Sequence, residues 1–357
     1  MAGSAIAGLG AQAAEMGNWI TTWASTPAPR WSDDLPAPFG VPEVLENQTV
    51  RQVARISVGG NSVRVVLSNA FGAKPLTIGA GSVGIAGKDG AVDQATLKPL
   101  TWGGKSSVVI PAGAPILSDP VALPAEALSE ISVSIFLPKK TALSWVHWDG
   151  VQTASISGPG NFTNDAAFKA DSTVKSRLFL SDIWVDAAPE SQAIVFFGDS
   201  ITDGNCSTPD ANNRWPDHVA NRLQEANRKV AVVNEAFSGN RVLTDGMGVN
   251  ALARFDSDVL SHPNVSDRRC DDGHQRYRLA RRKCNHAGRQ GTDRRRHHQR
   301  IQTTHRPRAC PWRTHRRCDV DPFRRHLQRA SYRGVLHTTE GRDTRHRERM
   351  DPHRRRL

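Results

Sequence analysis

A serine follows directly on an apolar run in the stretch IVFFGDSITDG, residues 194–204. Four apolar residues lead into Gly198, Asp199 and Ser200, which is how a buried strand would deliver a serine to the edge of a sheet. A serine in that place can act as a nucleophile if a general base and donors for an oxyanion lie nearby. In the plainer interpretation, the serine caps the helix that follows.

A second loop of small residues follows the next apolar run, VAVVN. It reads NEAFSGNR, residues 234–241, and contains Gly239 and Asn240. Small residues allow backbone N–H groups to approach a reacting oxygen closely, because no bulky side chain intervenes. The two loops are therefore candidate parts of one acyl-transfer site.

The elements around these loops have the pattern of a βαβ unit, which begins after Ala188. AIVFF is a continuous apolar run, as in a strand buried on both faces of a parallel sheet. In RWPDHVANRLQEAN, Trp215, Val219 and Leu223 recur every four residues on one predicted helix face. Pro216 suits the first turn of that helix. Open α/β sheets bind ligands at the carboxyl ends of their strands, where both loops lie.

The first half of the chain has a different pattern. Between Thr49 and Pro138, short runs alternate apolar and polar residues, among them TVRQVARISV, NSVRVVLSNAF, LTIGAGSVGIA and EISVSIFLP. Gly, Pro, Asn and Asp separate these runs, and helical spacing is nearly absent. The pattern predicts a β-sandwich or jelly-roll module.

The two loops resemble the SGNH, or GDSL, hydrolase family of esterases and lipases. FFGDSITDG is similar to the first family block and NEAFSGNRV to the second. The resemblance implies that Ser200 is the nucleophile and that the backbone N–H groups of Ser200 and Gly239 belong to the oxyanion hole, with Asp199 and Asn240 in support. The strand-rich half looks like the module before the catalytic domain in secreted bacterial members, so the resemblance covers residues 15–266.

An α/β fold class with an N-terminal β-sandwich follows from this resemblance. We expect a remnant signal peptide or leader at residues 1–14, a β-sandwich module at 15–188, the N-terminal half of an SGNH domain with a parallel, flavodoxin-like sheet at 189–266, and a non-native Arg-rich tail at 267–357. The implied reaction is hydrolysis of a small-molecule, polysaccharide or lipid ester, without metal or organic cofactor.

The N-terminus favours export. AGSAIAGLGAQAAE is apolar and ends in a cleavage-like run, as a signal peptide does, although a basic start is missing and a simple Ala/Gly leader is the alternative. We expect a secreted or periplasmic protein. No later stretch has the ~18 uninterrupted apolar residues of a membrane span.

Two further family blocks are missing: Gly-x-Asn-Asp, whose Asn donates to the oxyanion, and Asp-x-x-His, which carries the general base. Two segments match the second spacing, DDGH at residues 271–274 and DTRH at residues 343–346. The first lies where the Asn block belongs, and the second has Arg-rich flanks that indicate neither strand nor helix. We therefore expect the general-base His and the oxyanion Asn to be absent from this chain.

The tail suggests why these blocks are missing. From Asp267 onward the sequence has 27 Arg, 1 Lys and 10 acidic residues. The net charge of the whole chain is +12, and this segment contains its entire excess of basic over acidic residues. Read one base forward, residues 268–278 allow Val-Val-Val-Met-Met-Gly-Ile-Asn-Asp-Ile-Gly, a strand that runs into the missing Asn block. Residues 297–312 likewise allow an amphipathic helix, and residues 318–323 a strand end. We expect the chain from about Val265 to be an out-of-frame translation.

Other interpretations of the chain have less support. Nucleic-acid binding by the Arg run is disfavoured by the near absence of Lys and of interleaved aromatic residues. The close Cys pairs of structural zinc are missing from another candidate, a zinc site of Cys270, Cys284, His305, Cys310 and Cys318. Carbohydrate or surface binding by the β-module, beside a vestigial hydrolase domain, is the alternative function.

Overall fold

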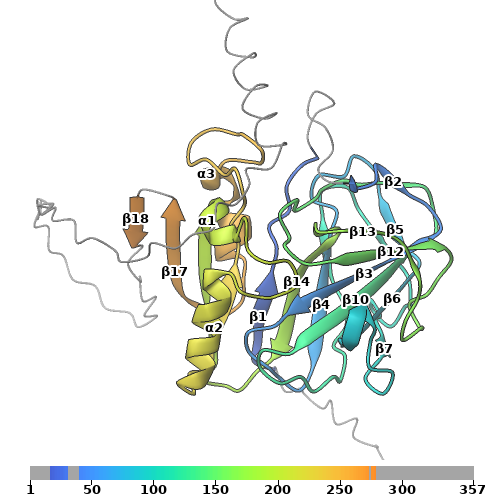
Figure 1. The fold of residues 1–357 in the computed structure, drawn as a ribbon, viewed down its shortest axis with the longest axis horizontal. Coiled ribbons are helices and arrows are strands. Elements are labelled where there is room, and N and C mark those ends of the chain that lie inside the picture. Colours follow the sequence, from blue (N-terminus) through green and yellow to red (C-terminus); the bar gives the residue numbers. More distant parts are fainter. Residues whose placement is uncertain (1–16, 31–39, 273–274, 279–357) are drawn as a thin grey trace, which may run out of the picture. The chain divides into compact units, whose positions relative to one another are not determined.

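The computed structural model describes residues 17–30, 40–272 and 275–278 of the chain. The expected leader and the tail from residue 279 onward therefore lie outside the described residues, as do the predicted frame-shifted helix and the DTRH segment. The described part is rich in strands and has few helices (Figure 1). None of its helices has the length and apolar content needed to cross a membrane.

Most strands of the described chain before Ala188 belong to two antiparallel sheets. The first consists, in spatial order, of β1 (Trp19–Ala24), β14 (Leu180–Asp186), β4 (Val63–Ser68) and β9 (Pro115–Leu117). The second consists of β13 (Ala170–Val174), β12 (Ala154–Pro159), β3 (Gln48–Arg55), β10 (Glu130–Leu137), β6 (Ala80–Ile85) and β7 (Lys98–Pro99). These sheets agree with the short strands that the period-two pattern predicts.

Smaller elements complete this half. They are the pair β2 (Val44–Leu45) and β11 (Thr141–Ala142), the pair β5 (Leu76–Ile78) and β8 (Val108–Ile110), and the short helix η2 (Lys88–Gly90). Polar positions of the larger sheet are also buried. In β3, Arg51 is 2% exposed because its guanidinium lies over Phe168 and donates to the Ala166 carbonyl at 2.9 Å. The central strand β3 is thus covered on both faces.

The chain after Ala188 forms a smaller sheet with helices. Its elements are β15 (Gln192–Gly198), α1 (Ser200–Asp203), α2 (Trp215–Glu225), β16 (Val230–Asn234), α3 (Ala251–Phe255), the π-helical η3 (Asp256–Leu260), β17 (Val265–Asp272) and β18 (Gln275–Arg278). The predicted helix face is confirmed, because Trp215, Val219 and Leu223 pack against Phe196 and Val232 of the sheet. Pro216 lies in the first turn, as expected.

The expected parallel, flavodoxin-like sheet is present only in part. The spatial order is β16-β15-β17-β18, in which β15 runs parallel to both neighbours and β18 is antiparallel. The described sheet is therefore mixed, and the described residues do not form a complete flavodoxin-like core. Strands outnumber helices in the described chain as a whole, so the α/β class applies to one half of it.

Strand β17 crosses the expected start of the tail at residue 267. Its backbone pairs with β15 from Ala193 to Gly198 and with β18, so the described sheet extends into the segment expected to be a non-native tail. The physical reason is that β15 presents a second edge of unpaired N–H and C=O groups, and an extended backbone can pair there whatever its side chains.

One hydrophobic core runs through both halves of the described chain. Val50 and Ile183 of the antiparallel sheets belong to the same buried cluster as Val195 and Val233 of the parallel strands. Strands β1 and β14, blue and green in Figure 1, lie on the side of the module that meets the parallel strands. The module is therefore packed directly against the segment that carries the predicted site.

Candidate active site

Ser200 lies at the carboxyl end of β15, as the sequence predicts, and is the first residue of α1. Asp199 caps this helix, because its carboxylate accepts a hydrogen bond from the Ile201 N–H at 3.0 Å. The interpretation of the serine itself as the cap is therefore wrong. Ser200 is partly exposed, and its hydroxyl makes no hydrogen bond to any residue that the structure describes. Its oxygen is available to a substrate.

Gly239 lies in the loop after β16, where its φ of +86° is in the left-handed region. A Cβ at this position would lie 2.4 Å from the Met247 Sδ. Both the backbone conformation and the lack of space therefore favour glycine at this position. The Phe237 N–H donates to the Gly198 carbonyl at 3.0 Å, which holds this loop against the turn that carries Ser200. The structure thus brings the two predicted loops together, while the oxyanion role of Gly239 stays a prediction.

Asn240 has one satisfied and one unsatisfied amide atom. Its Oδ1 accepts a hydrogen bond from the Arg254 Nε at 3.3 Å, whereas its Nδ2 is buried and has no partner. Leaving a buried donor unpaired costs about 1–3 kcal/mol, so such atoms are often reserved for a ligand. The predicted supporting residue therefore offers a free N–H next in the chain to Gly239.

A buried ion pair lies under the same two loops, and sequence reasoning missed it. The His147 Nε2 lies 2.8 Å from the Asp203 Oδ1, and its Nδ1 lies 3.1 Å from the Thr26 carbonyl. Burial by itself lowers the pKa of His147, but the charge and hydrogen bond of Asp203, together with the Thr26 carbonyl, outweigh it and raise that pKa. No local sequence pattern marks His147, which lies 56 residues before its partner.

No described histidine is hydrogen-bonded to Ser200. His147 and His262 have both ring nitrogens engaged by other groups, and His218 is exposed on α2. A general base must reach the proton that it removes, either directly or through one water. The described residues therefore contain no assembled base for Ser200, and His274 of the DDGH segment lies outside them.

A second group of titratable side chains lines a cavity of about 730 Å³ between the module and α3. The His262 ring lies between two carboxylates, with Nε2 2.9 Å from the Glu235 Oε1 and Nδ1 3.3 Å from the Asp182 Oδ1. Burial raises the pKa of Glu235 to about 7. Burial alone would lower the pKa of His262, but the neighbouring carboxylates raise it to about 9. His262 is therefore an imidazolium at neutral pH.

These three residues are the one described group whose ligand atoms are close enough to hold a metal ion. The arrangement of the ring argues against this use. Each ring nitrogen offers a single in-plane direction, for an N–H or for a metal bond after loss of the proton, and the two carboxylates face opposite nitrogens. A metal on either nitrogen would reach only one carboxylate in line. The group fits a hydrogen-bonded cation better than a metal centre.

Both predicted loops belong to a segment with known relatives. Residues 196–265 match the GDSL-like lipase/acylhydrolase family. The match includes Ser200 and Gly239 and supports a general esterase or hydrolase function. No curated protein matches the chain.

Solved structures similar to the chain include two carbohydrate esterases of family two. The enzyme from Cellvibrio japonicus is 13% identical, with a TM-score of 0.20, over 70% of this chain and 61% of that one. An active-site mutant of the enzyme from Clostridium thermocellum is 14% identical, with a TM-score of 0.17, over 67% and 60%. The chain thus spans about three fifths of the length of these enzymes.

Proposed function

We propose that this protein uses Ser200 to hydrolyse carboxylic esters by acyl transfer. The observation that carries the proposal is the Ser200 hydroxyl, which has no hydrogen bond to any described residue and lies just after a parallel strand. The turn that carries it is joined to the loop of Gly239 by the hydrogen bond from the Phe237 N–H to the Gly198 carbonyl. Ser200 would attack the ester carbonyl, and the N–H groups of Ser200 and Gly239 would stabilise the oxyanion of the tetrahedral intermediate.

The proposed site is incomplete in the chain as written. Removing the base of a serine triad typically costs several orders of magnitude in rate, and removing one oxyanion donor costs about 10²–10³-fold. We propose that both groups are encoded in the other reading frame, beyond about Val265. The family match ends at residue 265. Small-molecule, polysaccharide and lipid esters are the proposed substrate class, and secretion is the proposed location.

The test compares the 357-residue chain with a frame-restored chain on p-nitrophenyl esters of several acyl lengths. We expect turnover by the restored chain, essentially none by the 357-residue chain, and a loss of at least about 10³-fold on Ser200→Ala in the restored chain. Resequencing around codons 262–270 should reveal a single-base insertion or deletion. If no restored chain hydrolyses any of these esters, the assignment is wrong.

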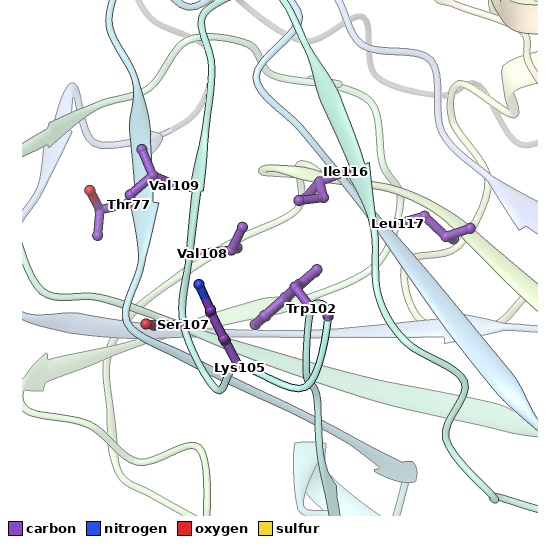
Figure 2. Close-up of a pocket in the computed structure, with 9 residues that line it drawn as sticks. Thr77, Trp102, Lys105, Ser107, Val108, Val109, Ile116 and Leu117 are labelled. Carbon is purple, nitrogen blue, oxygen red and sulfur yellow. The ribbon is translucent and has the colours of Figure 1, made fainter.

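Binding of a carbohydrate by the strand-rich module is the second candidate, and one observation favours it. A cavity of about 610 Å³ lies in the module, and Figure 2 shows Trp102, Lys105 and Val108 around it. None of its lining residues belongs to the 189–266 segment. Retention of the full chain on an insoluble polysaccharide, together with loss of retention in the Lys105→Ala variant, would support this function. A chain that passes through cellulose and xylan columns unretarded would exclude it for those polymers.

A further inference from the structure

Three consecutive residues of the strand-rich module bind the residue that precedes Gly239. This residue is Ser238, which is 1% exposed. The Ser238 hydroxyl donates to the Asp149 Oδ2 at 2.8 Å, and the Ser238 carbonyl accepts from the Trp148 Nε1 at 3.3 Å. The Ser238 N–H donates at 2.8 Å to the Asp203 Oδ2, whose other oxygen is held by His147. Every polar group of Ser238 is therefore fixed, directly or through one side chain, by residues 147–149.

The same contacts bind the helical turn that carries the nucleophile. Asp203 is the last residue of α1, which begins at Ser200, so one carboxylate joins that turn to the Gly239 loop. Asp149 provides a second link between the end of α1 and the Gly239 loop. It accepts from the Asn205 Nδ2 at 2.7 Å, just after α1, and from the Ser238 hydroxyl in the loop.

The hydrogen-bond partners of His147 determine its charge. Its Nδ1 faces the Thr26 carbonyl, which can only accept, and its Nε2 faces a carboxylate. Both ring nitrogens therefore donate, and His147 is a buried imidazolium paired with Asp203. The ring also makes a T-shaped contact with Phe237, with 5.3 Å between the ring centroids. His147 is thus committed to holding the two loops and cannot serve as the base of Ser200.

We propose that His147, Trp148 and Asp149 position the Gly239 N–H relative to the Ser200 hydroxyl. The strand-rich module would then contribute positioning residues to the active site. This inference rests on the proposed function. Gly239 follows Ser238 directly, so rotation of the peptide plane between the two residues would change the direction of the Gly239 N–H. An oxyanion hole depends on donors held about 2.7–3.1 Å from the oxygen, and small displacements cost rate.

The contacts of residues 147–149 with Ser238, directly and through Asp203, form a clamp on the Gly239 loop. Amide hydrogen exchange of the full 357-residue chain tests this clamp without requiring activity. We expect the Ser238 and Asn240 amides to exchange at least tenfold faster in His147→Ala and Asp149→Ala than in the wild type. Asp149→Asn keeps one acceptor oxygen and should restore most of the protection. Asp119→Ala is the matched control, because the Asp119 carboxylate also organises a loop, by accepting from Thr101 and two backbone N–H groups.

Unchanged exchange at Ser238 and Asn240 in the two Ala variants would overturn the proposal. Exchange in β3 serves as the internal reference. If β3 exchanges as fast as the loop in an Ala variant, that variant has unfolded, and the comparison then rests on Trp148→Phe, which removes the indole N–H and keeps an aromatic ring. Faster exchange confined to the loop in that variant supports the clamp, and wild-type exchange there counts against it.

Binding of phenylboronic acid to the same chain, followed by ¹¹B NMR, tests the consequence for the site. The Ser200 oxygen can form a bond to its boron while the hydroxyl proton is released to solvent. The boron then becomes a tetrahedral anion, and the adduct uses the same oxyanion donors. We expect Ser200→Ala to abolish the adduct, Asp149→Ala to weaken it at least tenfold, and Asp149→Asn to recover most of it. Equal affinity in the Asp149 variants would overturn the positioning role. A wild-type chain that forms no adduct would count against Ser200 as nucleophile, while the exchange experiment still decides the clamp.

Discussion

Gly239 is the residue at which the backbone of the candidate site is most constrained. It combines a left-handed φ with a side-chain position already occupied by Met247. We expect Gly239→Ala to lower the free energy of unfolding by about 1–3 kcal/mol from backbone strain alone, with a further loss from the contact. Urea unfolding of the full chain measures this change.

The control for this variant is Gly104→Ala. Gly104 also has a positive φ, +76°, but open space where a Cβ would lie. Its substitution should cost only the strain and leave boronic acid binding unchanged. Equal destabilisation by the two substitutions would show that the Met247 contact yields freely and does not constrain the loop.

His262 makes the stability of the described fold depend on pH. The pKa of His262 is raised from 6.5 to about 9 by the carboxylates of Glu235, Asp182 and Asp258, although burial opposes this shift. A raised histidine pKa means that the folded state holds its proton more tightly. Its stabilising contribution is therefore complete below about pH 6.5 and is lost as the pH rises through about 9. The loss is on the order of 3 kcal/mol.

Glu235 changes stability in the same direction, at lower pH. Burial raises its pKa to about 7, so its contribution is lost as the pH rises from about 4.5 to about 7. Urea midpoints measured between pH 5 and pH 9.5 should therefore fall steadily. His262→Gln should flatten the part of this curve above pH 7. A wild-type midpoint that rises from pH 7 to pH 9 would contradict the cationic assignment of His262.

At the scale of elements, β17 is the strand that the proposed frame shift would change. It pairs with β15 in the position of a central strand, where parallel sheets are normally apolar. The proposed frame-restored reading allows three successive Val in this strand, and burying each would contribute about 1.5–3 kcal/mol. We expect the restored chain to unfold at a higher urea concentration than the 357-residue chain.

A chain ending at residue 278 is the control for this comparison. It keeps β17 and β18 in the present frame and should unfold with the same midpoint as the 357-residue chain. Equal midpoints for the restored and present frames would mean that strand pairing alone, and not apolar burial, determines the stability of this edge.

At the scale of the whole molecule, the two halves depend on each other. Buried hydrogen bonds cross between them, as from the Thr26 hydroxyl to Glu235 at 2.6 Å and between Ser57 and the backbone of Val232. Separating the halves would expose part of the common core and leave these groups unpaired. We expect a fragment of residues 1–188 to be less stable than the full chain by at least about 3 kcal/mol. Addition of the 189–357 fragment should recover part of that loss in a urea titration.

Local patterns in the sequence were enough to locate the two loops and their elements. The apolar run before Ser200 and the four-residue spacing from Trp215 are properties of one strand and one helix, and both elements formed as predicted. The period-two runs of the first half likewise predicted antiparallel strands. Such patterns can be read in a sequence because the residues that cooperate are neighbours along the chain.

Only the tertiary structure decided which distant side chains meet. His147 and Asp203 are 56 residues apart, and Asp149 and Ser238 are 89 residues apart. Their sequence surroundings do not mark them as partners, because the contact exists only once the module packs on the parallel strands. The strand at residues 267–272 was missed for a related reason. Its pairing depends on the edge that β15 offers, and backbone hydrogen bonding does not depend on the Arg-rich side chains, which show no strand pattern.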